Sequence, residues 1–149
     1  MKKSLPLLAL FFCAVACNNA DKQEAGASEN DVDAARNFIQ AALKSDFRQA
    51  RTYMLTDSVN EGWMVLAERV NEHQSAEEKK RLAAASINIH NVSRPVQDSV
   101  TIVIYSNSYK NNRDTLKVVK QHGNWLVDLD YLFTHDRDTV GHRIDTISR

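Results

Sequence analysis

Cysteine, proline and glycine are all scarce in this chain, which has two cysteines, two prolines and four glycines among 149 residues. This composition excludes disulfide-rich scaffolds and collagen-like or low-complexity chains. So few glycines argue against a glycine-rich phosphate loop, and no nucleophile elbow or zinc-binding helix motif occurs either. Basic and acidic residues are balanced at 19 each, without a basic block, so we do not expect nucleic acid as a partner.

Long hydrophobic runs are also missing. The run from Leu5 to Ala16 is too short to span a bilayer, which takes about 20 apolar residues. It follows the basic residues Lys2 and Lys3 and ends in small residues, which is the pattern of a secretory signal peptide. We therefore expect residues 1–16 to be a signal peptide that is removed, and we expect no membrane-spanning helix.

Cys17 follows the signal peptide directly. The stretch Ala14-Val15-Ala16-Cys17 resembles the lipobox of bacterial lipoproteins, with Ala14 where that family favours Leu. The resemblance implies that the Cys17 thiol is diacylated, that the chain is cut before it, and that the new N-terminus is acylated. Ordinary cleavage after Ala16, which would release a soluble periplasmic protein, is the alternative. Cys13 is the poorer lipidation candidate because bulky Phe12 precedes it.

Lipidation of Cys17 would set the location of the protein. Each buried acyl methylene contributes ~0.8 kcal/mol of membrane affinity, so several chains on one residue give a stable anchor. Residue 18 is Asn, and lacks the Asp that retains lipoproteins in the inner membrane of some Gram-negative bacteria. We expect a lipid-anchored protein of the cell envelope, in the outer membrane. Cys13 leaves with the signal peptide, so the mature chain is expected to have no disulfide and no thiolate metal site.

The mature chain divides into three parts by composition. Residues 17–30 consist of the candidate lipidated Cys17 and a polar, unpatterned stretch that we interpret as a flexible tether, roughly 20 Å long on average. Residues 31–133 have the periodicity of a folded domain. Residues 134–149 form a polar tail with little pattern.

The first half of the domain has helical periodicity. Apolar residues recur every three or four positions, and Asp46 and Ser75 are suited to cap helices, the latter with Glu78 in a capping box. The predicted inward faces are Val32, Ala35, Phe38, Ile39, Ala42 and Leu43; Phe47, Ala50, Tyr53 and Met54; Trp63, Leu66, Ala67 and Val70; and Leu82.

From Ser86 onward the period changes to two, which is typical of strands. We predict strands at 87–90, at 99–109, at 115–121 and from Trp125 to Leu132, with an edge or loop at Pro95. Turns are predicted at Asn111–Asn112 and at residues 122–124, so these neighbouring strands should be antiparallel. The predicted inward face consists of Ile87, Ile89, Ile102, Ile104, Leu116, Val118, Trp125, Val127, Leu129 and Tyr131.

Helices followed by an antiparallel meander predict an α+β fold. The segments AARNFIQAALKSDFRQARTYM (34–54) and KVVKQHGNWLVDLDYL (117–132) resemble small lipoproteins of the nuclear transport factor 2-like superfamily, also called SnoaL-like or cystatin-like. Many of those lipoproteins have no known function. The resemblance implies N-terminal helices packed on a strongly curved antiparallel sheet, together cone-shaped. Some relatives with this cone are isomerases or dehydratases, and others only bind ligands or partners.

Two groups of residues could support chemistry. Asp128 and Asp130 lie two positions apart, as an acid–base pair on one face of a strand would. They alternate with the apolar residues of the last strand, so we expect them on the outer face, together with His90 and Lys117. The second group lies in the polar tail, where no helix or strand fixes it, so we expect no metal site and no cofactor; it consists of His135, Asp136, Asp138 and His142.

The large apolar side chains of the cone either fill it or line a pocket. The candidate lining residues are Tyr53, Trp63, Ile104, Trp125 and Tyr131. An interior without a titratable group can bind a ligand but has no acid or base for catalysis. We therefore expect a non-catalytic binding or interaction module for a small ligand or an envelope protein. The alternative is a cone-fold enzyme of the isomerase or dehydratase kind, transferring a proton on a small apolar substrate. A one-residue slip of the last strand would favour it, by turning both aspartates inward.

Overall fold

Helices occupy the first half of the domain and strands the second, as predicted. The computed structural model describes residue 28 and residues 30–134, so the signal peptide, Cys17, most of the tether and the tail histidines lie outside the described residues. Four helices precede four strands: α1 (Asp31–Leu43), α2 (Phe47–Arg51), α3 (Ser58–Glu72), α4 (Ala76–Ala83), β1 (Ile87–Val96), β2 (Val100–Asn107), β3 (Asp114–Gln121) and β4 (Asn124–Asp128). After β4 the chain is helical again over residues 129–134.

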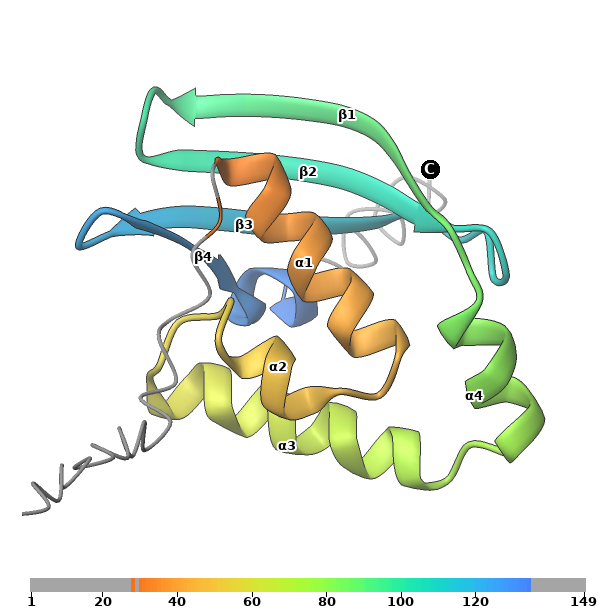
Figure 1. The fold of residues 1–149 in the computed structure, drawn as a ribbon. Helices are drawn as coiled ribbons and strands as arrows, with labels where there is room; N and C mark the ends of the chain where they lie inside the picture. The colour runs from red at the N-terminus through yellow and green to blue at the C-terminus, as the bar shows by residue number, and fades with distance from the viewer. Residues whose placement is uncertain (1–27, 29, 135–149) are drawn as a thin grey trace, which may run out of the picture.

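The strands form one antiparallel sheet in the order β1-β2-β3-β4, which bends but does not close (Figure 1). His122 and Gly123 have positive φ angles of 51° and 85° in the tight turn between β3 and β4, as a two-residue hairpin requires. At the far edge of β4, the Val127 N–H donates to the Tyr53 carbonyl (2.8 Å) and the Leu55 N–H donates to the Val127 carbonyl (2.9 Å). The chain after α2 therefore extends this edge of the sheet.

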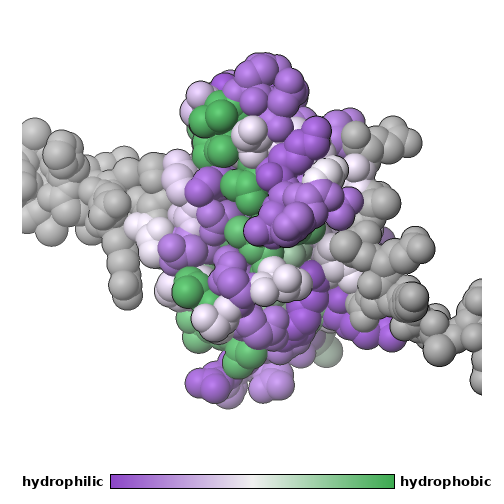
Figure 2. Space-filling view, turned by 90° about the vertical axis from the view of Figure 1, so that its left-hand side faces the viewer, coloured by the Kyte–Doolittle hydropathy of each residue, from purple (hydrophilic) through white to green (hydrophobic). Residues whose placement is uncertain are grey.

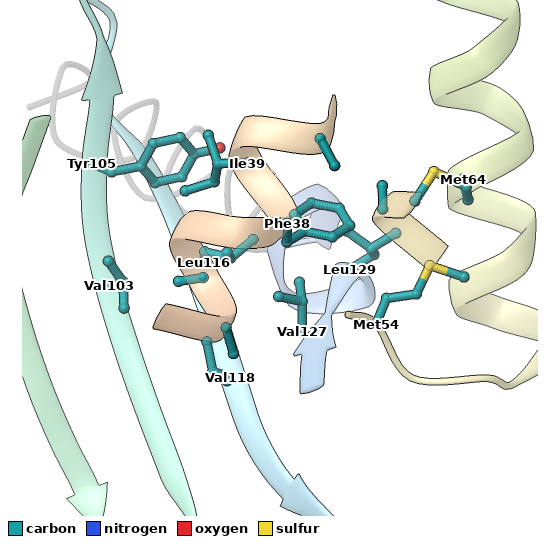
Figure 3. Packing of buried hydrophobic residues seen from close by; sticks show 14 residues of the cluster. Phe38, Ile39, Met54, Met64, Val103, Tyr105, Leu116, Val118, Val127 and Leu129 are labelled. Carbon is teal, nitrogen blue, oxygen red and sulfur yellow. The ribbon is translucent and has the colours of Figure 1, made fainter. Parts of the chain in front are cut away.

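Helix α1 lies across the inner face of the sheet, and α2 and α3 lie beyond it (Figure 1). Its buried residues include Ala35, Phe38 and Ile39, which lie on the predicted stripe, and Ala34, which lies beside it. Figure 3 shows Phe38 between the sheet and the two methionines on the α3 side. The sheet contributes Val103, Tyr105, Leu116, Val118 and Val127 to this core, and Met54 and Met64 close it on the other side.

Polar caps fix where the helices begin. The Asp46 carboxylate accepts from the Gln49 N–H (3.0 Å) at the start of α2, and the Ser75 hydroxyl accepts from the Glu78 N–H (3.1 Å) at the start of α4. Both caps were predicted. Asp57 caps α3 by accepting from Val59 and Asn60. Each such cap contributes about 1 kcal/mol to helix stability.

The buried face of α3 differs from the predicted one. Asn60 and Met64 are 3% and 1% exposed, whereas Leu66 and Val70 are 41% and 56% exposed. The Asn60 side chain turns inward because its Oδ1 accepts from the backbone N–H of Leu129 (2.6 Å). A hydrophobic pattern does not identify a polar residue that faces inward to bind the backbone. The predicted stripe is therefore rotated about the axis of α3 relative to the face that is buried.

The face assignment of β2 is wrong in the same way. Thr101, Val103 and Tyr105 face the helices and are buried, while Ile102 and Ile104 lie half-buried on the outer face. Both faces of this strand have β-branched residues, so alternation alone could not decide between them. The inward face is the one that contains Thr101, because the Thr101 hydroxyl donates to the buried Asp31 carboxylate (2.5 Å).

The last strand ends earlier than predicted, at Asp128. Leu129 is 2% exposed and belongs to the core, but it lies in the helical segment 129–134 rather than in a strand. Residues 129, 132 and 133 are spaced as helical core residues, and Leu132 and Phe133 pack against the core. The apolar residues of this segment therefore fit both the two-residue period of a strand and the helical period, and the segment is helical in the structure.

Pro95 lies in β1, an edge strand whose register shifts between Ser93 and Val96. This agrees with the edge position expected from the sequence. Within the described residues no helix is long and apolar enough to cross a bilayer. Figure 2, which views the end that is on the left in Figure 1, shows only a narrow band of hydrophobic side chains between hydrophilic ones.

Candidate functional site

An apolar groove opens between the helices and the sheet, with a cavity volume of about 340 Å³. Its apolar wall comes from helices α1, α3 and α4, from the first residue of α2 and from residue 133. This wall consists of Ile39, Ala42, Leu43, Phe47, Leu66, Ala67, Val70, Leu82 and Phe133. Five polar or amphipathic side chains complete it: Asn71, Gln74, Tyr105, Asn107 and Asp114. We call this site the α1–α3 groove.

An ion-pair cluster holds α3 against α2 on the side away from the sheet. The Arg51 guanidinium lies 2.5 Å from a carboxylate oxygen of Glu68 and 2.8 Å from one of Glu61. The Glu68 carboxylate raises the pKa of Arg51, and the hydrogen bonds from Arg51 lower the pKa of Glu68. Because the three groups are partly exposed, the cluster fixes the orientation of α3 more than it adds stability.

Aromatic stacking joins α3 to the helical segment 129–134. The rings of Trp63 and Phe133 stack with centroids 4.5 Å apart, and the Trp63 Nε1–H donates to the Asp130 carboxylate (3.2 Å). Phe133 is thereby held in the wall of the groove. Contacts within the protein therefore hold α3 and Phe133 in the positions that form the groove.

The polar residues of the groove come from the end of α3 and from β2 and β3. The Asn71 side-chain amide donates to the Ser45 hydroxyl (2.8 Å) and to the Gln74 side-chain oxygen (3.2 Å). Tyr105 and Asp114 are cross-strand partners in β2 and β3. Burial raises the pKa of Tyr105, and the Asp114 charge raises it further, so the phenol stays protonated at neutral pH.

Comparison with known proteins yields no relative: no family model, no curated protein and no solved structure matches the chain.

None of the five candidate pocket residues from the sequence lines the α1–α3 groove. Trp63 does not line the groove, but its ring stacks on that of Phe133, which does. Tyr53 lies on the far side of α1, where its hydroxyl accepts from the Gln49 side-chain amide (3.0 Å). Ile104 is on the outer face of β2. Trp125 packs against the edge of the core, with the Lys120 ammonium 5.4 Å from its ring centre.

Tyr131 is also displaced, because it lies in the helical segment 129–134. The Lys117 ammonium lies 5.9 Å from its ring centre, and the same ammonium pairs with Asp128 at 2.9 Å. Since Lys117 is on the outer face of β3, Tyr131 is placed at that face rather than toward the helices. The inward position predicted for Tyr131 depended on a longer strand and is wrong.

Asp128 and Asp130 do not form the paired site that their spacing suggested. Asp128 lies on the outer face and pairs with Lys117, as the face assignment predicted. Asp130 lies beyond the end of β4 and binds the indole of Trp63. The two carboxylates therefore serve different contacts, because the strand that would have placed them on one face ends between them.

The expectation that no carboxylate faces the interior is wrong. Asp31, 4% exposed, accepts from Arg94 Nε (2.7 Å) and Nη2 (3.1 Å), from the Thr101 hydroxyl, and from the Val32 N–H (2.9 Å). Burial acts to raise its pKa, but these hydrogen bonds outweigh burial and lower it. Asp31 is a fully bonded structural carboxylate that joins α1 to the sheet, whereas Asp114 is the carboxylate that lines the groove.

None of the described histidines lines the α1–α3 groove. His90 is exposed, as expected, and its Nε2 lies 2.9 Å from the hydroxyl of buried Ser106. Among the described residues no hydrogen bond joins His90 to a carboxylate, so this pair lacks the third group of a catalytic triad. The same residues contain no cluster of three or more His, Cys, Asp or Glu side chains suited to a metal ion.

Proposed function

We propose that this protein is an envelope lipoprotein whose domain binds a small, largely apolar molecule in the α1–α3 groove without transforming it. The acyl chains on Cys17 would hold it on the membrane, and the outer membrane is the location that Asn18 favours. The observation that supports binding most directly is the groove itself, apolar in nine of its lining residues. Its volume of about 340 Å³ is at the small end of the range for ligand pockets.

We also propose that the domain belongs with the nuclear transport factor 2-like cone folds. Two features support this assignment. The helix α1 packs into the inner face of a bent antiparallel sheet, and the two segments that carry the resemblance, 34–54 and 117–132, form α1–α2 and the β3–β4 hairpin. The groove corresponds to the side of such a cone where the helices meet the sheet.

Burial of apolar surface would supply most of the binding free energy. Each methylene group that leaves water contributes ~0.8 kcal/mol, or about a fourfold gain in affinity. The exposed fractions of Leu66 (41%) and Val70 (56%) are high for large aliphatic side chains of a folded domain. A ligand in the groove would cover apolar surface that the free protein leaves in water.

The contacts of the acidic groups support a non-catalytic role. Asp31, Asp128 and Asp130 are each bound to a protein partner, and within the described residues no buried side-chain N or O atom lacks a hydrogen-bond partner. Asp114 is the one observation that favours the alternative, a cone-fold enzyme for proton transfer, because its carboxylate lines the groove. A ligand extracted from membrane-purified protein, identified by mass spectrometry and returned to fresh protein, should be recovered unchanged. Its conversion would establish the enzyme instead.

A matched pair of variants tests binding in the groove. Leu66 and Val65 are neighbours on α3 with nearly equal exposure, 41% and 42%, but only Leu66 lines the groove. The processed chain, made with Cys17→Ser so that no acyl chain competes, is titrated with octan-1-ol by calorimetry. Leu66→Asp should weaken binding at least tenfold, because it places a charge in the apolar wall, and Val65→Asp should leave it within twofold. Equal effects of the two variants, or no binding by the parent chain, would contradict the proposal.

A further inference from the structure

Two turns of the sheet and the start of α1 meet at one end of the domain. The turn between β1 and β2 is joined to the end of β3, because the Lys120 N–H donates to the Ser99 carbonyl (2.8 Å). The first residue of α1, Asp31, reaches the same end, where its carboxylate binds Arg94 of β1 and Thr101 of β2. Figure 1 shows both turns and the start of α1 on the left of the molecule. We call residues 94–99 and 120–125 the turn end.

The turn end exposes side chains of the kinds that favour a lipid surface. Val96 is 52% exposed, and the half-buried ring of Trp125 has the Lys120 ammonium 5.4 Å from its centre. Tryptophan is enriched at the level of the lipid headgroups, where a neighbouring lysine can extend to the phosphates. Figure 2 faces this end and shows a narrow hydrophobic band between hydrophilic side chains. Such a band suits shallow contact with the headgroup region.

The chain enters the domain at this end. Asn30 caps α1 there, and the Ser28 hydroxyl accepts from the side-chain amide of Asn37 (3.2 Å), in the first half of α1. Residues 18–27 separate this contact from Cys17, and a polar stretch of ten residues spans roughly 15–20 Å on average. A tether of this length keeps the domain at a local concentration on the order of millimolar beside the lipid, so that even a weak contact is populated.

We propose that the turn end is a membrane-contact surface, with Val96, Lys120 and Trp125 seated among the lipid headgroups of the membrane that holds the anchor. This inference rests on the proposed lipid anchor and adds the face on which the domain lies. The α1–α3 groove is lined by the last turn of α1, about 20 Å from the start of this 13-residue helix. Contact through the turn end therefore leaves the groove open to water.

The two tryptophans of the chain measure the contact at two places. Trp125 lies at the turn end, whereas Trp63 stacks on Phe133 in the groove wall. The processed chain, in which Cys17 is the single thiol, is coupled to a maleimide lipid in vesicles of three parts phosphatidylethanolamine and one part phosphatidylglycerol. A fraction of the lipids has a nitroxide near the headgroup.

Trp63→Phe leaves Trp125 as the only tryptophan, and Trp125→Phe leaves Trp63. The nitroxide should quench the fluorescence of Trp125 at least twice as strongly as that of Trp63. Equal quenching of the two, or stronger quenching of Trp63, would overturn the inference.

Two valines of similar exposure provide a matched control in the Trp63→Phe background. Val96 is 52% exposed at the turn end, and Val70 is 56% exposed in the groove. Val96→Glu places a carboxylate in the contact surface, so it should reduce the quenching of Trp125 at least twofold. Val70→Glu adds the same charge at the other end of the domain and should leave the quenching within a fifth of its original value. Equal effects of the two variants would contradict the proposal.

A second variant keeps the test decisive if Val96→Glu does not fold. Lys120→Glu brings a carboxylate toward the anionic lipid, so it should also reduce the quenching of Trp125 at least twofold. Unchanged quenching in this variant would count against the inference. Because the lipid is coupled chemically, the two proposals fail separately. A native N-terminus without acyl groups would refute the lipid anchor, whereas unquenched Trp125 on the vesicles would refute the contact surface alone.

Discussion

The buried carboxylate of Asp31 is the contact whose loss should destabilise the domain most clearly. It accepts four hydrogen bonds, two of them from the Arg94 guanidinium, and it joins the start of α1 to β1 and β2. Since α1 forms one wall of the groove, the site depends on this connection. We predict the effect of Asp31→Asn, which keeps the shape of the side chain and removes its charge.

The magnitude follows from the partners. A hydrogen bond to a charged group contributes about 1.5–3 kcal/mol, and the loss of one partner from a buried pair costs about 3–5 kcal/mol. The Arg94 side chain is 43% exposed and can regain water, which reduces the cost. We expect Asp31→Asn to lower the free energy of unfolding by about 2–3 kcal/mol. For a domain of this size that corresponds to a fall in melting temperature of about 10–20 °C.

Asp33→Asn is the matched control, because it removes the same charge from the same first turn of α1. The Asp33 carboxylate accepts from the Asn30 side-chain amide (2.7 Å), and among the described residues no hydrogen bond or ion pair joins it to the sheet. Its substitution should cost no more than about 0.5–1 kcal/mol, the usual contribution of an acid to a helix N-terminus. Urea denaturation followed by tryptophan fluorescence measures both variants. If Asp31→Asn costs no more than Asp33→Asn, the reasoning is refuted.

The pH dependence gives an independent check on the same carboxylate. The pKa of Asp31 is lowered in the folded protein, so the folded state binds fewer protons than the unfolded state as the pH falls. The stabilisation is fully present above the ordinary carboxyl pKa of ~3.9 and is lost as the pH falls through the folded pKa. The stability difference between the parent chain and Asp31→Asn should therefore be constant near neutral pH and shrink in acid. A difference that grows on acidification would contradict this account.

Two further predictions concern lipid attachment and the last strand. Cys17→Ser should abolish lipid attachment, leaving an unprocessed precursor or a protein released from the membrane fraction, whereas a parent chain whose N-terminus has no acyl groups by mass spectrometry would disprove the lipoprotein hypothesis. Trp125→Ala should destabilise the domain by about 2 kcal/mol, less than the 3–5 kcal/mol typical of a fully buried tryptophan, because the ring is half-buried at the sheet edge. A cost below about 0.5 kcal/mol in urea denaturation would show that the ring does not pack on the core.

The parts of the fold that depend on local chemistry could be predicted from the sequence. The stripe around Phe38 and Ile39 predicted α1, the caps at Asp46 and Ser75 predicted where two helices begin, and the residues 122–124 predicted a hairpin turn. Each depends on residues within a few positions of one another, where propensity and hydrogen bonding act directly.

The buried faces of α3 and β2 could not be predicted, because distant contacts decide them. Asn60 faces inward to bind the backbone of Leu129, sixty-nine positions away. Thr101 faces inward to meet Asp31, seventy positions away. Hydrophobic periodicity, helical for Asn60 and alternating for Thr101, assigns both positions to the surface. A long-range hydrogen bond between a buried polar pair can outweigh it, since an unpaired buried group is costly.

The sequence pattern did select several residues of the groove, but it assigned them to the core. Leu66, Ala67 and Val70 belonged to a stripe predicted to be core, and they form a groove wall instead. Phe47 was also predicted to be a core residue, and it lines the groove. Nothing in the sequence pattern marked Asp114 as a groove residue. It is the first residue of β3, and the pairing of β3 with β2 places it opposite the groove residue Tyr105.

Intermolecular nuclear Overhauser effects between octan-1-ol and methyl groups of the processed chain test the central claim most directly. The account predicts contacts from the alkyl chain to the methyl groups of Ile39, Leu66, Val70 and Leu82, which come from three helices and converge only in the α1–α3 groove. Contacts confined to Val65, which is exposed outside the groove, or to Ile104 on the outer face of the sheet would contradict it.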